Sequence, residues 1–194
     1  MDMITEKERN YYLKKKRILM RTFDMVLNIG KQILIDYFGE SKFKEISITM
    51  RNDFEALIPQ IPFVGGKDSR FTDTIINATS LLPLLRAFEK EGLGYYEIGK
   101  LTYNLFEAIF KVIPPTDDIF TEEYLNNEKA RAKNSKLRKY PGDWVFDFVE
   151  GDGKTFSYGI DYSECGVHKF YKNQDAEHFM PIACIADYAQ AQIY

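Results

Sequence analysis

Side chains capable of acid–base and nucleophilic chemistry gather in the last part of the sequence. The set consists of Asp161, Glu164, Cys165, His168, Glu177, His178, Cys184 and Asp187. Carboxylates and imidazoles transfer protons, and a thiolate is both a nucleophile and a metal ligand. Such a set suits hydrolysis of a small molecule, in which a base activates the attacking group and an acid protonates the leaving atom.

The two cysteines, Cys165 and Cys184, leave three interpretations open. They can bind a divalent metal, zinc or manganese, together with a carboxylate or an imidazole; one can be a nucleophile; or both can be core residues, because free thiols are among the most buried side chains. The 18 residues between them match no short zinc spacing. His168 lies one helical turn after Cys165 and would lower the pKa of that thiol, the alternative being an ordinary surface histidine.

Two carboxylates are expected to assist the thiols. Asp187 follows Cys184 by three residues, so both lie on one face of a predicted helix. Its neighbours in sequence are largely apolar, and an aspartate in such surroundings needs a partner. We predict that Asp187 is a base or an orienting group and that Glu164 supports it, the alternative for Glu164 being solvation near a helix start.

A glycine-containing connector precedes one of the predicted helices. Its residues Gly65, Gly66 and Lys67 are predicted to bind the substrate, because backbone N–H groups before a helix N-terminus can hold a carboxylate. The alternative is a shaped turn that only joins two helices. Ile61 stands where a phosphate-binding loop requires glycine, which excludes that motif.

Basic residues concentrate between Lys129 and Lys139. Such a run is usually a solvated helix face, and a lid over an anionic substrate is the alternative. Trp144 follows the run closely in sequence, and we predict that it contacts the substrate.

The elements that must position these residues change in character along the chain. Apolar residues at helical spacing predict helices throughout 1–115, one of which Pro83 should kink or divide. Residues 116–141 form an irregular, polar connector, within which 122–139 can form a helix. The alternation within 142–162 predicts an antiparallel hairpin, and 180–194 is predicted to be one amphipathic helix that packs over it.

The predicted fold class is therefore α+β, a single domain with a helical N-terminal half (1–115), the connector (116–141) and an α+β part (142–194). A lone hairpin is rarely stable without further strands or a covering helix. We therefore expect the natural chain to continue past residue 194 and to complete the sheet.

Composition limits the setting in which this chemistry would take place. The chain has 194 residues, 45% of them hydrophobic, and a formal net charge of -3. That charge does not favour nucleic-acid binding, and no apolar run approaches the ~20 residues of a membrane helix. The low cysteine content and the charged N-terminus predict a cytoplasmic protein. The expected partner is a small-molecule substrate, and binding to nucleic acid or to a membrane is not expected. Assembly into a homo-oligomer is an open alternative.

Two stretches resemble the L-2-amino-thiazoline-4-carboxylic acid hydrolase family. The first runs from Ala56 through the Ile-Pro-Phe-Val-Gly-Gly-Lys segment that ends at Lys67, and continues to Gly94. The second combines Asp-Trp-Val-Phe-Asp-Phe-Val-Glu at 143–150, Tyr-Gly-Ile-Asp-Tyr-Ser-Glu-Cys at 158–165 and Pro-Ile-Ala-Cys-Ile-Ala-Asp-Tyr at 181–188.

The resemblance implies a hydrolase that opens a cyclic amidine-like ring, giving N-carbamoyl-L-cysteine in a bacterial route of cysteine biosynthesis. The family continues beyond the position of residue 194 with a further cysteine, which would supply a third sulfur to a metal site. On this hypothesis Cys165, Cys184 and Asp187 carry the chemistry, supported by Glu164 and His168. The alternative function is a non-catalytic small-molecule or metal-binding module on the same fold.

Overall fold

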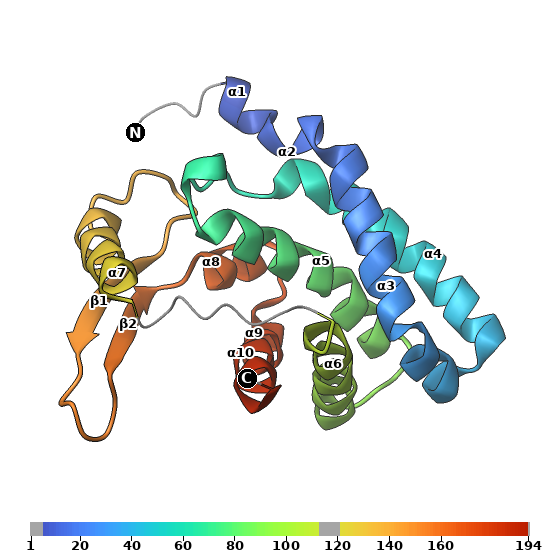
Figure 1. The fold of residues 1–194 in the computed structure, drawn as a ribbon. Helices are drawn as coiled ribbons and strands as arrows, with labels where there is room; N and C mark the ends of the chain where they lie inside the picture. Colours follow the sequence, from blue (N-terminus) through green and yellow to red (C-terminus); the bar gives the residue numbers. More distant parts are fainter. Residues whose placement is uncertain (1–5, 113–120, 194) are drawn as a thin grey trace.

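The computed structural model describes residues 6–112 and 121–193, and their arrangement confirms the predicted α+β class (Figure 1). The N-terminal half contains α1 (Glu6–Arg9), α2 (Tyr11–Lys14), α3 (Lys16–Phe38), α4 (Glu40–Leu57), η1 (Ile58–Gln60), η2 (Gly66–Asp68), α5 (Phe71–Lys90) and α6 (Tyr95–Phe110). The second part contains α7 (Glu122–Ser135), β1 (Val145–Glu150), β2 (Tyr158–Glu164), α8 (Gly166–Asn173), η4 (Glu177–Phe179), α9 (Met180–Ala183) and α10 (Ile185–Ile193).

The long helices α3 and α4 pack side by side because a single residue, Gly39, reverses the chain between them (Figure 1). Its φ of 82° lies in the left-handed region that glycine adopts without steric cost. The two helices meet through Phe23 and Phe54, whose rings stack with centroids 4.7 Å apart. The second helix begins at Glu40, directly after this glycine.

Helix α5 continues through Pro83 without division. The predicted break is absent because Pro83 is buried, with Leu82, Leu84 and Leu85 buried beside it. Burial of this apolar segment outweighs the cost of a missing backbone donor. α5 thus remains one long element, which α4 and α6 contact.

The strands β1 and β2 form an antiparallel hairpin, with Val145 opposite Glu164 and Glu150 opposite Tyr158. Helix α7 packs along β1, where the Ser135 hydroxyl accepts a hydrogen bond from the Phe146 N–H at 3.1 Å. The last helix, α10, packs chiefly on α6. The helix along β1 is therefore the one within the predicted polar connector.

The predicted single helix at 180–194 is divided at Cys184, which separates α9 from α10. Residue 194, the last residues of the predicted helical half (113–115) and the first part of the connector (116–120) lie outside the described residues. Over 6–112 and 121–193, no helix combines the length and the apolar character needed to cross a membrane.

Candidate functional site

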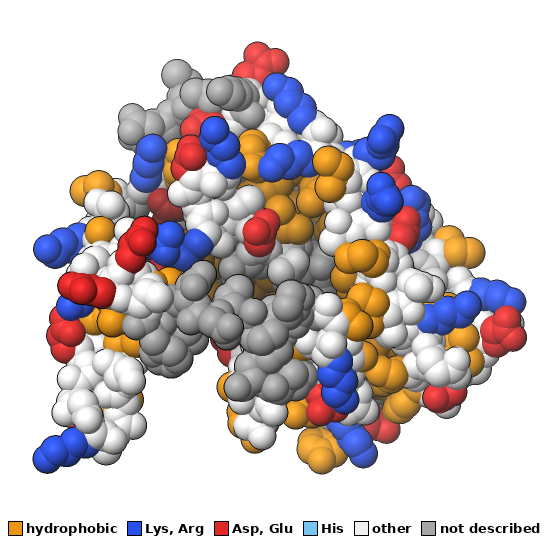
Figure 2. Space-filling view, viewed as in Figure 1, with side chains coloured by type: hydrophobic (Ala, Val, Ile, Leu, Met, Phe, Trp, Pro, Cys, Tyr) orange, Lys and Arg blue, Asp and Glu red, His pale blue; other side chains and the backbone are white. Residues whose placement is uncertain are grey.

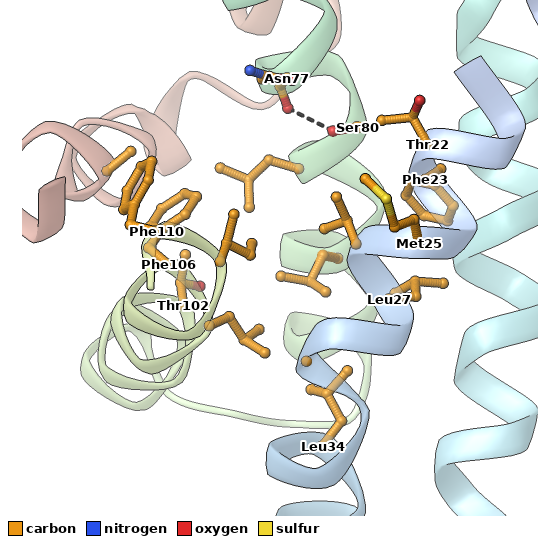
Figure 3. Close-up of a pocket in the computed structure, with 17 residues that line it drawn as sticks. Thr22, Phe23, Met25, Leu27, Leu34, Asn77, Ser80, Thr102, Phe106 and Phe110 are labelled. Atoms are coloured by element: carbon orange, nitrogen blue, oxygen red, sulfur yellow. Dashed lines mark hydrogen bonds between the residues drawn. The ribbon is translucent and has the colours of Figure 1, made fainter. Parts of the chain in front are cut away.

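An apolar cavity of about 290 Å³ lies among α3, α5 and α6, and Ala186 of α10 reaches its edge (Figure 3). Hydrophobic side chains from three helices form most of its wall, including Leu27, Leu34, Leu81, Leu84, Leu105 and Phe106. In the space-filling view, hydrophobic side chains gather over α3 on the side of α6 (Figure 2). Met25 belongs to the cavity wall and is also among the exposed large hydrophobic residues.

Helical periodicity and one glycine shape this cavity. The apolar residues of α3 repeat at helical spacing, and the helix packs on α4 and on α6. Its side toward α6 forms one wall of the cavity. On that face, Gly30 allows α3 to approach α6 closely, because a Cβ at this position would lie 2.5 Å from Leu105 Cδ2. Leu105 therefore rests against the glycine backbone instead of occupying the cavity.

Polar groups are few around the cavity. Thr22 and Asn77 lie at its exposed side, where the Ser80 hydroxyl donates a hydrogen bond to the Asn77 carbonyl oxygen at 2.8 Å. Thr102, on α6, is fully buried, and its Oγ1 finds no hydrogen-bond partner among the residues that the structure describes. Its side chain projects from α6 toward the cavity (Figure 3).

The wall carries no Asp, Glu, Lys, Arg or His among the described residues that form it. Transfer of an ionised group from water into such surroundings is strongly unfavourable without a partner charge. The cavity is therefore suited to a neutral molecule.

Of the residues predicted to carry chemistry, Cys165, Cys184 and Asp187 lie near one another. Cys184 is exposed, but partial desolvation of its thiol raises the pKa, and the nearby Cys165 and Asp187 raise it further. Partial desolvation also raises the pKa of the Asp187 carboxyl, although the residue keeps much of its surface in contact with solvent. A thiol with a raised pKa is a poor nucleophile at neutral pH, because less of it is thiolate.

The other predicted catalytic residues are paired with neighbouring side chains on the surface. Glu164 accepts from Lys169 at 2.6 Å and from Arg138 at 2.7 Å, and these hydrogen bonds lower the pKa of its carboxyl. His168 Nε2 lies 2.6 Å from Glu177 Oε1, so this histidine is paired with a carboxylate rather than with Cys165. His178, for its part, contacts Glu89 at 3.2 Å.

The predicted metal ligands, Cys165 and Cys184, do not gain a third donor within the part of the chain that the structure describes. No cluster of three or more His, Cys, Asp or Glu residues there is arranged to hold a metal ion. The predicted zinc or manganese site is therefore unsupported by the described residues.

Trp144, predicted to contact substrate, is a core residue instead. It is 5% exposed, and its ring stacks on Phe71 with centroids 4.3 Å apart. A Cβ on Gly166 would lie 2.5 Å from the Trp144 ring, so α8 begins against this indole. The large apolar ring is buried because the start of α5, β1 and α8 meet there.

The connector glycines have a packing role in this structure. Gly65 and Gly66 both have positive φ, at 105° and 61°, and the Gly66 carbonyl accepts a hydrogen bond from the Thr72 hydroxyl at 2.6 Å. Tyr11 lies 2.9 Å from the position of a Cβ on Gly66. Lys67 is exposed. These contacts favour the alternative of a shaped turn over a carboxylate-binding loop.

Sequence reasoning missed a buried charge network at the base of the hairpin. Glu128 of α7 is 0% exposed and pairs with Arg70 at 2.7 Å and with Arg131 at 2.5 Å. The Arg70 guanidinium also donates to the Tyr162 hydroxyl at 3.1 Å and lies over the Phe71 ring. Glu128 lies beside the basic run, which was predicted to be a solvated helix face. The one sequence signal for its ion pair is the i, i+3 spacing to Arg131.

The basic run itself binds the hairpin rather than covering a ligand. Lys129 pairs with Glu150 and Lys136 with Asp147, both at 2.7 Å. These exposed pairs fasten α7 along β1, and each contributes little alone. They leave the lid hypothesis without structural support.

Compared with protein-family models, with curated proteins and with solved structures, the chain matches none of them.

Proposed function

We propose that this protein binds a small, neutral, apolar molecule in the cavity among α3, α5 and α6. The observation that carries this proposal is the combination of size and wall chemistry: about 290 Å³ of space, with a wall free of charged side chains over the described residues. Ligand pockets are typically concave, mostly apolar and equipped with a small number of polar groups.

The volume sets the size of the ligand. An apolar cavity of about 150 Å³ is large enough to take up benzene. A cavity roughly twice that size accommodates a molecule of about twelve carbons, such as a substituted naphthalene or a medium-length chain. An ionised aminothiazoline carboxylate is a poor match, because no described cation in the wall offsets its charge.

The proposal is tested by fluorescence titration of the purified protein with 2-isopropylnaphthalene. A variant that fills the cavity, Ala186→Phe, is compared with Ala191→Phe, which places the same ring on the exposed side of α10. We expect saturable binding at one site, at least tenfold weaker in Ala186→Phe and unchanged in Ala191→Phe. Circular dichroism of both variants verifies that the helices are retained.

Two results would overturn this assignment. One is the absence of saturable binding by the folded wild-type protein. The other is equal affinity in wild type and Ala186→Phe, which would place the ligand elsewhere.

A second candidate function is the ring-opening hydrolase implied by the resemblance. The observation that favours it is the proximity of Cys184 to Cys165 and Asp187, which would offer a thiol beside a carboxylate of raised pKa. Incubation with L-2-amino-thiazoline-4-carboxylate, followed by mass spectrometry for a product one water heavier, tests this candidate. Turnover that disappears in Cys184→Ala would establish it, and an unchanged substrate would eliminate it.

We also propose that the protein is cytoplasmic. Both cysteines are free thiols, which supports work in a reducing compartment.

A further inference from the structure

Two buried threonines on neighbouring helices differ in the hydrogen bonding of their hydroxyl groups. Thr79 of α5 and Thr102 of α6 are both 0% exposed. The Thr79 hydroxyl donates to the Ile75 carbonyl oxygen, one turn back in the same helix, at 2.7 Å. Within 6–112 and 121–193, the Thr102 hydroxyl has no such partner, although it also lies within a helix. The difference is that Thr102 belongs to the cavity wall.

An unpartnered buried hydroxyl has an energetic cost. A buried polar group without a hydrogen bond destabilises a protein by about 1–3 kcal/mol, and native structures contain few of them. A ligand that supplies the missing partner would recover this free energy on binding. We infer that the ligand of this cavity is a neutral apolar carbonyl compound, a ketone, aldehyde or ester, whose oxygen accepts a hydrogen bond from Thr102 Oγ1. This inference rests on the proposed binding function and specifies its ligand.

The carbonyl class follows from counting donors and acceptors. A hydroxyl group donates one hydrogen and also accepts. If the ligand carried a hydroxyl, one contact with Thr102 would leave one O–H hydrogen without an acceptor in an apolar space. An amide would likewise bring N–H donors with no acceptor nearby. A carbonyl oxygen brings no hydrogen of its own, so a single contact satisfies both partners.

Charge excludes carboxylic acids, and among neutral groups that only accept hydrogen bonds a carbonyl oxygen is a stronger acceptor than an ether oxygen. A carboxylic acid is ionised at neutral pH, and the described wall offers no cation for it. The apolar remainder of the molecule would pack against the leucine and phenylalanine side chains that form the rest of the wall (Figure 3).

The experiment compares two probes of nearly equal shape, 2-acetylnaphthalene and 2-isopropylnaphthalene, which differ by a carbonyl oxygen in place of a methyl group. Each is titrated against wild type, Thr102→Val and Thr79→Val. We expect wild type to bind the ketone more tightly than the hydrocarbon. Thr102→Val should weaken binding of the ketone about five- to tenfold, the range of one hydrogen bond, and should leave the hydrocarbon unchanged or slightly tighter.

The control variant and the failure modes separate the two proposals. Thr79→Val makes the same replacement of a hydroxyl by a methyl group, but outside the cavity wall. The ratio of the ketone affinity to the hydrocarbon affinity should therefore stay at its wild-type value. Equal affinity for both probes, or a ratio that Thr102→Val does not alter, overturns the carbonyl inference while the binding function stands. Failure of both probes to bind overturns the binding function as well.

Discussion

Residue types place the functional site in the segment between Asp161 and Asp187. The structure favours instead the cavity among α3, α5 and α6. The segment contains the thiols, imidazoles and carboxylates, yet Glu164 is held in ion pairs, His168 lies within hydrogen-bond distance of Glu177, and the pKa of Cys184 is raised. The cavity contains ordinary leucines and phenylalanines, yet it leaves space and one unpartnered hydroxyl. A reactive side chain whose polar atoms are already paired has little capacity left for a ligand.

The largest expected effect lies in the charge network that supports the hairpin region. Glu128→Gln removes the negative charge that Arg70 and Arg131 share while keeping the shape of the side chain. Breaking a buried pair leaves uncompensated charge, so the free energy of unfolding should fall by about 3 kcal/mol. Urea denaturation of this variant and of Glu123→Gln, which changes an exposed glutamate on the same helix, measures the difference.

If the two variants unfold at the same urea concentration, the network is not what holds α7 to the rest of the molecule. The polar pairs would then not distinguish this part of the molecule from the apolar cavity.

The two buried threonines give the next largest effect, with opposite signs. Thr79→Val deletes a satisfied hydrogen bond and should lower the free energy of unfolding by about 1 kcal/mol. Thr102→Val deletes an unsatisfied hydroxyl and should raise it by about 1 kcal/mol. Thermal denaturation without ligand compares them, and destabilisation of equal size in both would mean that Thr102 is bonded in solution.

Two buried glycines sharpen the description of the cavity wall. Gly30→Ala places a methyl group against the flexible end of Leu105, which has to move toward the cavity. The gain in helix propensity offsets much of the strain, so the free energy of unfolding should change by less than about 1 kcal/mol. Affinity for 2-isopropylnaphthalene should nevertheless fall about threefold, because space is lost.

Gly99→Ala on α6 is the matched control for this change. Its Cβ would meet Ile185 Cδ1 at 3.7 Å, an ordinary contact, so binding should be unaffected. Equal affinity in wild type and Gly30→Ala would show that Leu105 does not bound the space that the ligand occupies.

The smallest effect concerns the reactivity of Cys184. Because burial, Cys165 and Asp187 raise the pKa of this thiol, its alkylation by iodoacetamide should require higher pH than that of a free cysteine. In a Cys165→Ala background, which leaves Cys184 as the single thiol, Asp187→Asn removes a negative charge that disfavours the thiolate. The pKa should then fall, and alkylation at neutral pH should accelerate about two- to threefold.

Asp175→Asn, an exposed change on the loop before η4, serves as the control and should leave the rate as it was. Rapid alkylation of Cys184 below neutral pH would contradict a raised pKa and would return the hydrolase candidate to first place.

Periodicity in the sequence was sufficient for the helices and the hairpin, because apolar residues repeat at the spacing of each element. Leu34 and Leu105, for example, lie at helical spacing and are buried. What periodicity does not convey is whether three inward faces meet without a gap, and the space beside Leu105 depends on the single hydrogen side chain of Gly30.

The candidate site was predicted less well than the fold, for a related reason. Residue type indicates what a side chain can do, whereas its partners decide what it does, and those partners are distant in sequence. Arg70 meets Glu128 and Tyr162 only once the start of α5, helix α7 and the hairpin are assembled. Trp144 looked accessible beside a basic run but is covered where Phe71 and Gly166 meet it.

The most direct test of the account is methyl NMR on protein labelled at its methionines, because one methionine reports on each region. Met25 belongs to the cavity wall, and Met180 begins α9, next to the Cys184 region. On addition of 2-isopropylnaphthalene, the Met25 methyl resonance should shift and saturate while that of Met180 stays in place; L-2-amino-thiazoline-4-carboxylate should move neither. An unmoved Met25, or a Met180 resonance that responds to the carboxylate, would contradict the placement of function in the apolar cavity.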